Sequence, residues 1–166
     1  MSFETSIVLI YALLLFLTVL TVLCTIVWTL NIKKKIKGLS DSVLEITPEE
    51  FFKIRNSSNG GRGRKHISTE YDFSGVYIIY NHTQDMYYVG QGKKVFQRVN
   101  NHFTGHGNGD VYADYKYGDD FTIKMIALEK SGFKTLNELE RNTIMTYNAY
   151  SRGYNKTKGN KGWMCN

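Results

Sequence analysis

The chain has 166 residues, a net charge of +6 and a sequence pI near 9.2, so we expect anionic partners, either nucleic acid or phospholipid. Its two cysteines, Cys24 and Cys165, are too few for a disulfide framework, which excludes the small disulfide-stapled proteins of the secreted class. The C-terminal part, residues 71–166, is long enough for one small core but not for two domains.

The N-terminal segment is the most apolar part of the chain. It has no charged residue from Thr5 to Ile32, and a helix needs about 20 apolar residues to cross a bilayer. The positive charges follow the apolar run instead of preceding it, and no Ala-x-Ala cleavage pattern is present, which argues against a signal peptide. A buried helix of a soluble domain seldom avoids charge for so long. We therefore predict a transmembrane helix over residues 5–32.

A lysine cluster directly after the apolar run sets the expected orientation. Trp28 lies near the same boundary, as an interfacial aromatic residue would, with an ordinary lipid-facing side chain as the alternative. The cluster consists of Lys33, Lys34, Lys35 and Lys37. By the positive-inside rule, the N-terminus lies outside and everything after Lys33 lies in the cytoplasm. The expected location is the inner (cytoplasmic) membrane, crossed once.

Residues 33–70 are expected to form a basic juxtamembrane segment and a flexible linker. A short helix is predicted within them, with Thr47 as its N-cap, Pro48 at its first position and Glu50 closing a capping box. The stretch from Asn56 to Lys65 combines glycines with basic residues and predicts a hinge. Its charges suit either a phosphate backbone or anionic lipid, and the sequence leaves both open.

Residues 71–166 are expected to form one α+β domain, a small three-stranded antiparallel sheet flanked by helices. Strands are predicted where β-branched and aromatic residues predominate, over Gly75–Tyr80, Met86–Gly90 and Phe121–Leu128. The polar residues between the first two strands predict a hairpin turn. The three strands alternate with segments of helical pattern, which gives the α+β class.

Two main helices are predicted to pack against this sheet. One spans Lys94–Phe103, where apolar residues recur at every fourth position. The other spans Thr135–Tyr150 and begins with Thr135 and Glu138 as a capping box. A glycine-rich loop and a shorter helix separate the two.

Three side chains on these helices suggest phosphate chemistry. Arg98 and His102 are four positions apart and share one helix face, where an arginine fork can bind phosphate and a histidine can relay a proton. A solvated basic helix edge is the structural alternative. Glu140 lies on an apolar stripe, where a carboxylate is costly unless it is paired or binds a cation. A salt bridge to a nearby Arg or Lys, Arg98 among them, and a magnesium site both remain open.

Short motifs occur in a fixed order along residues 74–157: Gly75-Val76-Tyr77, Tyr88-Val89-Gly90, Arg98, His102, Glu140 and Gly153-Tyr154-Asn155. This ordered set resembles the GIY-YIG nuclease family. The resemblance implies hydrolysis of a phosphodiester bond with one divalent cation, Mg²⁺ or Mn²⁺, held by Glu140. It also implies that Arg98 stabilises charge on the phosphate and that Tyr77 accepts a proton from the attacking water, with His102 assisting or taking that role.

The remaining implied site residues are Tyr88, which would position water or phosphate, and Asn155, which would orient the site through hydrogen bonds. Lys93 and Lys94 follow the second motif and are weaker candidates for nucleic-acid contact, with surface solvation as the alternative.

Span and nuclease pattern together predict a membrane-anchored, divalent-metal-dependent DNA endonuclease that faces the cytoplasm. Cutting incoming foreign DNA, as in superinfection exclusion or a barrier to DNA entry, is the biological role that such a tether suggests. The alternative is a non-catalytic membrane-tethered protein that binds nucleic acid or a partner. RNA is left open as a substrate.

Overall fold

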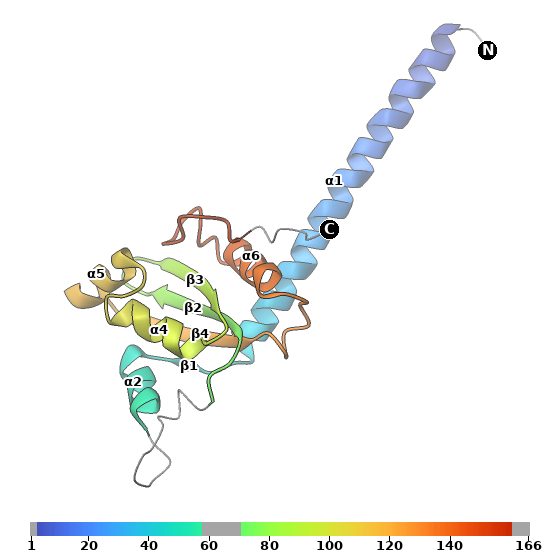
Figure 1. Ribbon diagram of the computed structural model, residues 1–166. Helices are drawn as coiled ribbons and strands as arrows, with labels where there is room; N and C mark the ends of the chain where they lie inside the picture. Colours follow the sequence, from blue (N-terminus) through green and yellow to red (C-terminus); the bar gives the residue numbers. More distant parts are fainter. Residues whose placement is uncertain (1–2, 58–70, 161–166) are drawn as a thin grey trace.

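Helix α1 spans Phe3–Asp41 and runs without a break from the apolar segment into the folded domain (Figure 1). The computed structural model describes residues 3–57 and 71–160, and within them α1 is the one helix long and apolar enough to cross a membrane. Its large apolar side chains from Val8 to Leu30 are exposed, as lipid contact would require. The segment predicted to span the membrane, residues 5–32, lies within this helix.

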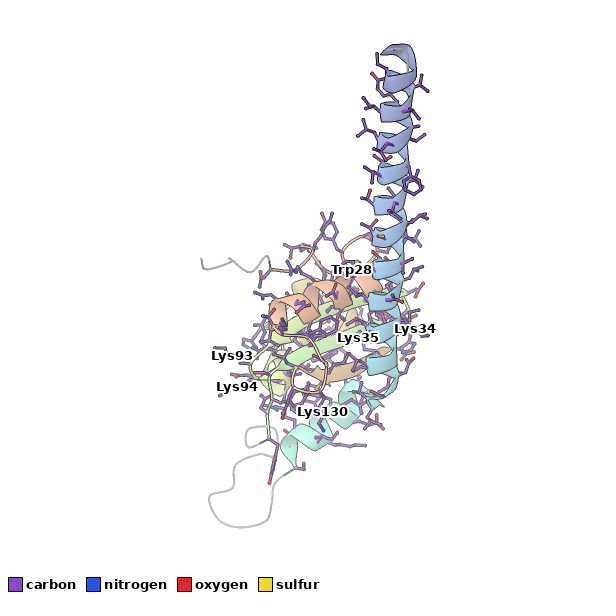
Figure 2. The ribbon with its side chains drawn as sticks, turned by 90° about the vertical axis from the view of Figure 1, so that its right-hand side faces the viewer. Trp28, Lys34, Lys35, Lys93, Lys94 and Lys130 are labelled. Carbon is purple, nitrogen blue, oxygen red and sulfur yellow. The ribbon has the colours of Figure 1, made fainter. Side chains whose placement is uncertain are left out.

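The C-terminal end of α1 is part of the domain's core. Ile36 is fully buried, and Ile32 packs against the same apolar cluster. Lys35 donates a hydrogen bond of 3.0 Å to the carbonyl oxygen of Gly132, and its ammonium group lies 4.2 Å from the ring centroid of Phe133 (Figure 2). α1 therefore continues through residue 33, where the sequence predicts that a linker begins.

Four strands form one antiparallel sheet in the order β1-β4-β2-β3. Their bounds are β1 Glu45–Ile46, β2 Gly75–Asn81, β3 Met86–Gly92 and β4 Phe121–Ala127. The α+β class is confirmed, but the prediction of three strands is wrong because it omits β1. A strand of two residues has no alternation for a sequence pattern to reveal. It forms because α1 delivers the chain to the sheet edge, where Glu45 pairs with Lys124.

Shorter helices complete the described fold: α2 Pro48–Asn56, α4 Val95–Phe103, α5 Gly109–Tyr117 and α6 Leu136–Thr146. The capping box predicted for α2 is confirmed, since the Thr47 N–H donates to the Glu50 carboxylate at 2.9 Å and the Glu50 N–H donates to the Thr47 hydroxyl at 3.3 Å. Only half of the box predicted for α6 forms. The Thr135 hydroxyl accepts from the Glu138 N–H at 3.1 Å, but the Glu138 carboxylate accepts from the Lys134 N–H.

The two faces of the sheet carry separate apolar cores. Alternation along β2 directs Tyr77 and Ile79 to one face, where α2, α4 and α5 lie, and Val76 and Ile78 to the other, where α1 and α6 lie (Figure 1). α1 contacts both α6 and β4, so the long helix closes the second core.

β1 and α2 lie in the stretch that the sequence assigns to a connector, residues 33–70. In the structure Ile46 is 5% exposed, and the fully buried Phe51 ring stacks on Phe96 with centroids 5.8 Å apart. The folded domain therefore begins within α1. The hinge predicted from Asn56 to Lys65 lies outside the described residues except for its first two.

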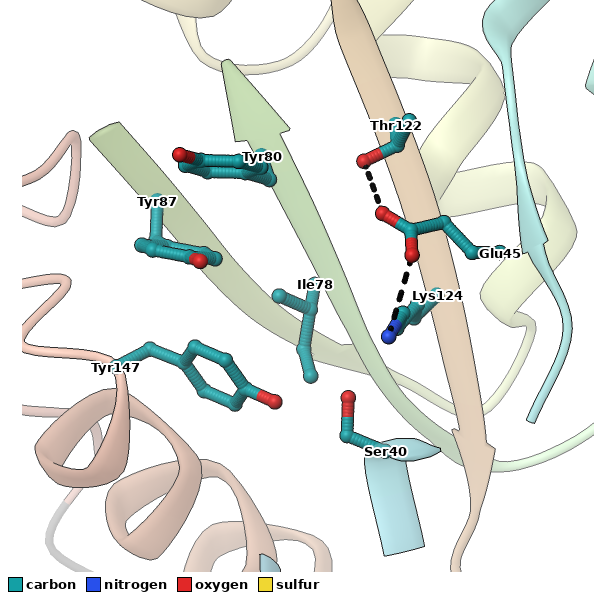
Figure 3. Close-up of a pocket in the computed structure, with 8 residues that line it drawn as sticks. All are labelled: Ser40, Glu45, Ile78, Tyr80, Tyr87, Thr122, Lys124 and Tyr147. Carbon is teal, nitrogen blue, oxygen red and sulfur yellow. Dashed lines mark hydrogen bonds and ion pairs between the residues drawn. The ribbon is translucent and has the colours of Figure 1, made fainter. Parts of the chain in front are cut away.

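A small cavity of about 50 Å³ lies where the end of α1 meets the sheet (Figure 3). The rings of Tyr80 and Tyr87 line one side, and the ion pair of Lys124 with Glu45, 3.3 Å long, lines another. The hydroxyl of Ser40 is buried on its wall and has no hydrogen-bond partner among the described residues. Tyr77 and Tyr88, described below, lie on the opposite face of the sheet from this cavity.

Candidate active site

Tyr77 and Tyr88 lie side by side on the face of the sheet that α4 covers. Tyr77 comes from β2 and Tyr88 from β3, with ring centroids 6.1 Å apart. Strand register places Gly90 opposite Tyr77, and a Cβ at Gly90 would collide with the Tyr77 hydroxyl and ring. The glycine of the second motif is therefore required by the close approach of the first motif's tyrosine.

His102 of α4 fixes the Tyr77 hydroxyl from the other side. Its Nε2 lies 2.8 Å from the Tyr77 hydroxyl oxygen, and its Nδ1 accepts a hydrogen bond of 2.8 Å from the backbone N–H of Asn108. A backbone N–H can only donate, so Nδ1 carries no proton and the neutral ring carries its proton on Nε2. Burial, aided by the positive charge of Arg98, lowers the pKa of His102 to about 4. The ring is therefore neutral near pH 7 and donates its Nε2–H to Tyr77.

Tyr88 lies beside Tyr77, and the two phenols affect each other's ionisation. Burial and the neighbouring Tyr88 raise the pKa of Tyr77 well above its ordinary value, while Arg98 opposes this shift. Burial also raises the pKa of Tyr88, whereas Tyr77 and the charge of Arg98 lower it. Tyr77 is fully buried whereas Tyr88 is partly exposed, so Tyr88 is the phenol that meets solvent.

Arg98 places a positive charge at the centre of the site. Its guanidinium lowers the pKa of Tyr77, Tyr88, His102 and Glu140 alike. His102 lies on the same helix as Arg98, whereas Tyr77 comes from β2, Tyr88 from β3 and Glu140 from α6. The side chain is exposed, so an anionic substrate can reach it.

Glu140 of α6 is 8% exposed, and burial raises its pKa. Its Oε2 accepts hydrogen bonds from the Gln91 side chain at 3.0 Å and from the Asn160 N–H at 3.3 Å. The salt bridge to Arg98 that the sequence left open is not among the ion pairs of the described residues. Arg98 acts on Glu140 as a nearby charge only.

Glu140 fits a single-carboxylate site for a divalent cation. Within residues 3–57 and 71–160, no group of three His, Cys, Asp or Glu side chains is placed to hold a metal. Mg²⁺ often binds through one carboxylate together with waters and substrate phosphate, so one acid suffices. Both hydrogen bonds to the carboxylate from described residues end on Oε2, which leaves Oε1 for a cation.

Asn155 lies at the edge of β3 and not among the polar side chains of the site. Its Oδ1 accepts from the Val89 N–H at 2.8 Å, and its Nδ2 donates to the Val89 carbonyl at 2.7 Å. The Asn155 amide thus forms with Val89 the pair of hydrogen bonds that the backbone of a neighbouring strand would form. It holds β3, and with it Tyr88, in register.

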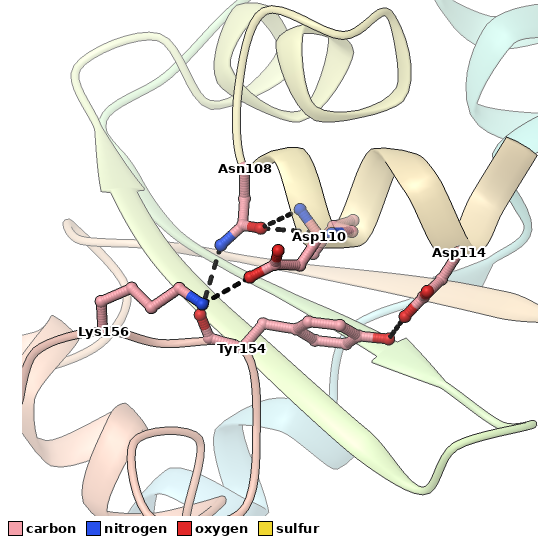
Figure 4. A network of polar contacts seen from close by, with 6 residues as sticks. Asn108, Asp110, Asp114, Tyr154 and Lys156 are labelled. Atoms are coloured by element: carbon pink, nitrogen blue, oxygen red, sulfur yellow. Dashed lines mark hydrogen bonds and ion pairs between the residues drawn. The ribbon is translucent and has the colours of Figure 1, made fainter.

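Asn108 joins the site to the segment that follows α6 (Figure 4). Its Oδ1 caps α5 by accepting from the Asp110 N–H at 2.9 Å, and its Nδ2 donates to the Tyr154 carbonyl at 3.2 Å. The Tyr154 hydroxyl donates to Asp114 at 2.5 Å. Since the backbone N–H of Asn108 also meets His102, this network sets the histidine tautomer.

Three residues that contact the site were missed from the sequence: Gln91, Asn108 and Asn160. Gln91 directly follows the second motif, and that adjacency is the signal that could have drawn attention to it. Asn108 and Asn160 meet the site through backbone N–H groups, which no side-chain pattern reveals. Lys93 and Lys94 are exposed between β3 and α4, outside the ion pairs of the described residues (Figure 2).

Comparison with known proteins gives one match. A family model described as the GIY-YIG catalytic domain matches residues 73–155. No curated protein and no solved structure matches the chain.

Proposed function

Since the chain belongs to the GIY-YIG nuclease family, we propose that it is a membrane-anchored, divalent-metal-dependent DNA endonuclease. One arrangement carries the catalytic part of this proposal: the Tyr77 hydroxyl lies 2.8 Å from His102 Nε2 and beside Tyr88, and the charge of Arg98 lowers the pKa of these groups and of Glu140. A phosphodiester placed among these groups meets a cation, hydroxyl groups and a carboxylate, the set needed for hydrolysis. DNA is the proposed substrate.

In the proposed reaction water attacks the phosphorus atom and the P–O bond to the leaving oxygen breaks. Tyr77, once ionised to the phenolate, is the proposed base that accepts the proton of the water, and Tyr88, the more exposed phenol, positions that water. His102 assists without accepting the proton, because its Nε2 already carries one and donates to Tyr77. The Nε2–H of His102 and the charge of Arg98 would stabilise a Tyr77 phenolate, against the burial and the neighbouring Tyr88 that raise the pKa of Tyr77.

Glu140 is the proposed holder of Mg²⁺ or Mn²⁺, a cation that would polarise a phosphate oxygen and neutralise charge on the leaving group. Arg98 stabilises charge that develops on the phosphate. Asn155 keeps β3 in register, and Lys93 and Lys94 are proposed as contacts to the nucleic-acid backbone.

The test uses full-length protein in detergent micelles with supercoiled plasmid. We expect Mg²⁺-dependent cleavage that a chelator abolishes, and a loss of roughly 10²–10³ in rate with Arg98→Ala. Glu140→Gln keeps the shape of the side chain and removes its charge, so activity should fall similarly. Lys116→Gln and Glu129→Gln change the same kinds of charge at exposed sites elsewhere and should leave cleavage unchanged. Binding of plasmid without cleavage would support the alternative, a non-catalytic membrane-tethered binding protein.

The proposed location is the inner membrane, with the N-terminus outside and the nuclease domain in the cytoplasm, where it cuts incoming foreign DNA. Support comes from the exposed apolar length of α1 and from the lysines that follow it. A soluble version must keep Ile32 and Ile36, because both lie in the core. Deleting residues 1–30 should therefore preserve cleavage of plasmid but abolish protection of cells against phage or transforming DNA. Protection that survives this deletion would refute the role of the anchor.

A further inference from the structure

A large cavity opens between α1 and α6, on the side of the domain that faces the apolar segment. Its volume is about 930 Å³, within the range of small-molecule sites. Trp28 forms its α1 wall, and residues of α6 and of the segment after α6 form the rest. Figure 2 shows Trp28 on α1 above Lys34 and Lys35, beside the edge of the domain. The cavity lies outside the site described above.

The lining of this cavity is amphipathic and basic. Lys134, Arg141 and Lys158 are exposed cations on it, and none of them forms an ion pair with another described residue. One carboxylate, Glu138, also lines the cavity, and its Oε2 accepts from a backbone N–H. Cations therefore outnumber acids on the lining. Trp28 and the side chains of α6 add apolar surface beside them.

The position of Trp28 along α1 indicates the level in the membrane at which the cavity lies. It lies one helical turn before Ile32, where the uncharged run ends, which corresponds to about 6 Å along the helix axis. Tryptophan at this position is typical of the headgroup level of a bilayer. A ligand bound against Trp28 would therefore lie among phospholipid headgroups, where duplex DNA has no access.

We propose that this cavity binds one anionic phospholipid, with its phosphate near Lys134, Arg141 and Lys158 and the start of its acyl chains along Trp28. The proposal rests on the membrane anchoring of α1 proposed above and is independent of nuclease activity. Charge complementarity and depth both favour a lipid of the cytoplasmic leaflet as the occupant. The bound lipid holds α6 against the membrane and fixes the height of the domain.

The experiment measures contact between lipid and Trp28 in the full chain reconstituted in bilayers. Trp163→Phe removes the second of the two tryptophans, so quenching by brominated lipid reports on Trp28. Phosphatidylglycerol and phosphatidylcholine, each brominated on its acyl chains, are compared in mixed bilayers. We expect selective quenching by phosphatidylglycerol, with selectivity falling about fivefold for each of Arg141→Gln and Lys158→Gln. Lys130→Gln removes an exposed lysine outside the cavity and should leave selectivity unchanged (Figure 2).

Four outcomes would overturn the proposal. Equal quenching by the two lipids shows that the cavity does not select an anionic headgroup, whether or not plasmid is cleaved. Selectivity that Lys130→Gln reduces as much as Arg141→Gln shows a diffuse charge effect in place of a site. Selectivity that appears only after deletion of residues 161–166, or that a short DNA duplex abolishes, assigns the cavity to the chain's own end or to nucleic acid.

Discussion

Acidification is expected to destabilise the folded domain through His102. The side chain is 1% exposed, and burial together with the charge of Arg98 lowers its pKa from the ordinary 6.5 to about 4. The unfolded chain thus binds a proton at this ring near pH 6.5, whereas the folded chain does so only near pH 4. The stability associated with the neutral ring is present in full above pH 6.5 and is lost as the pH falls from 6.5 towards 4.

The expected loss follows from the size of this shift. One pKa unit corresponds to about 1.4 kcal/mol, so the free energy of unfolding should fall by roughly 2 kcal/mol by about pH 5 and by roughly 3 kcal/mol by about pH 4. Glu140 acts in the opposite direction. Burial raises its pKa, so the folded carboxyl takes up a proton before the unfolded one, and acid relieves part of its burial cost.

The assay isolates His102 by comparison with His102→Gln. Urea unfolding of the full chain in detergent micelles, followed by near-ultraviolet circular dichroism, gives the free energy of unfolding at each pH. The wild type should lose roughly 2 kcal/mol more than His102→Gln between about pH 7 and pH 5. His82→Gln, at an exposed position in the hairpin turn, should keep the wild-type profile. Parallel profiles for wild type and His102→Gln would refute the assignment of a buried neutral ring.

Two further substitutions test the fold and the motif geometry. Ile36→Ala removes a fully buried side chain and should lower the free energy of unfolding of the domain by about 2–5 kcal/mol, whereas Ile10→Ala, in the exposed apolar segment, should not lower it. Equal effects of the two variants in urea unfolding would show that the end of α1 lies outside the core. Gly90→Ala should lower the free energy of unfolding by about 1–3 kcal/mol and reduce plasmid cleavage, because the added Cβ collides with Tyr77. Gly109→Ala is the control, since a Cβ at Gly109 meets open space. Unchanged cleavage by Gly90→Ala would contradict the close approach of Tyr77 to Gly90.

Local patterns were sufficient to predict most elements. Apolar length predicted the N-terminal helix, and Thr47 with Glu50 predicted the start of α2, because both depend on residues close together in the chain. The hairpin of β2 and β3 was predicted for the same reason, and its register brings Tyr77 and Tyr88 together. The identity of these site residues came from the order of the motifs and not from any single one of them.

Such local patterns could not predict contacts between segments that are far apart in the sequence. β1 was missed because its pairing with β4 depends on where α1 ends, and the burial of Ile36 was missed because helical periodicity does not state which surface a helix meets. The hydrogen bonds of Gln91 and Asn160 to Glu140 likewise join residues that only the closed fold brings together.

The sequence by itself determined that an apolar helix precedes a domain with the ordered side chains of a phosphodiester hydrolase. Only the tertiary structure decided that this helix enters the domain's core, that His102 donates to Tyr77, and that a basic cavity lies beside Trp28. The physical reason is the separation along the chain over which each effect acts. Propensity and capping act within a few residues, whereas burial, tautomer and cavity depend on backbone groups and faces that approach from remote parts of the chain.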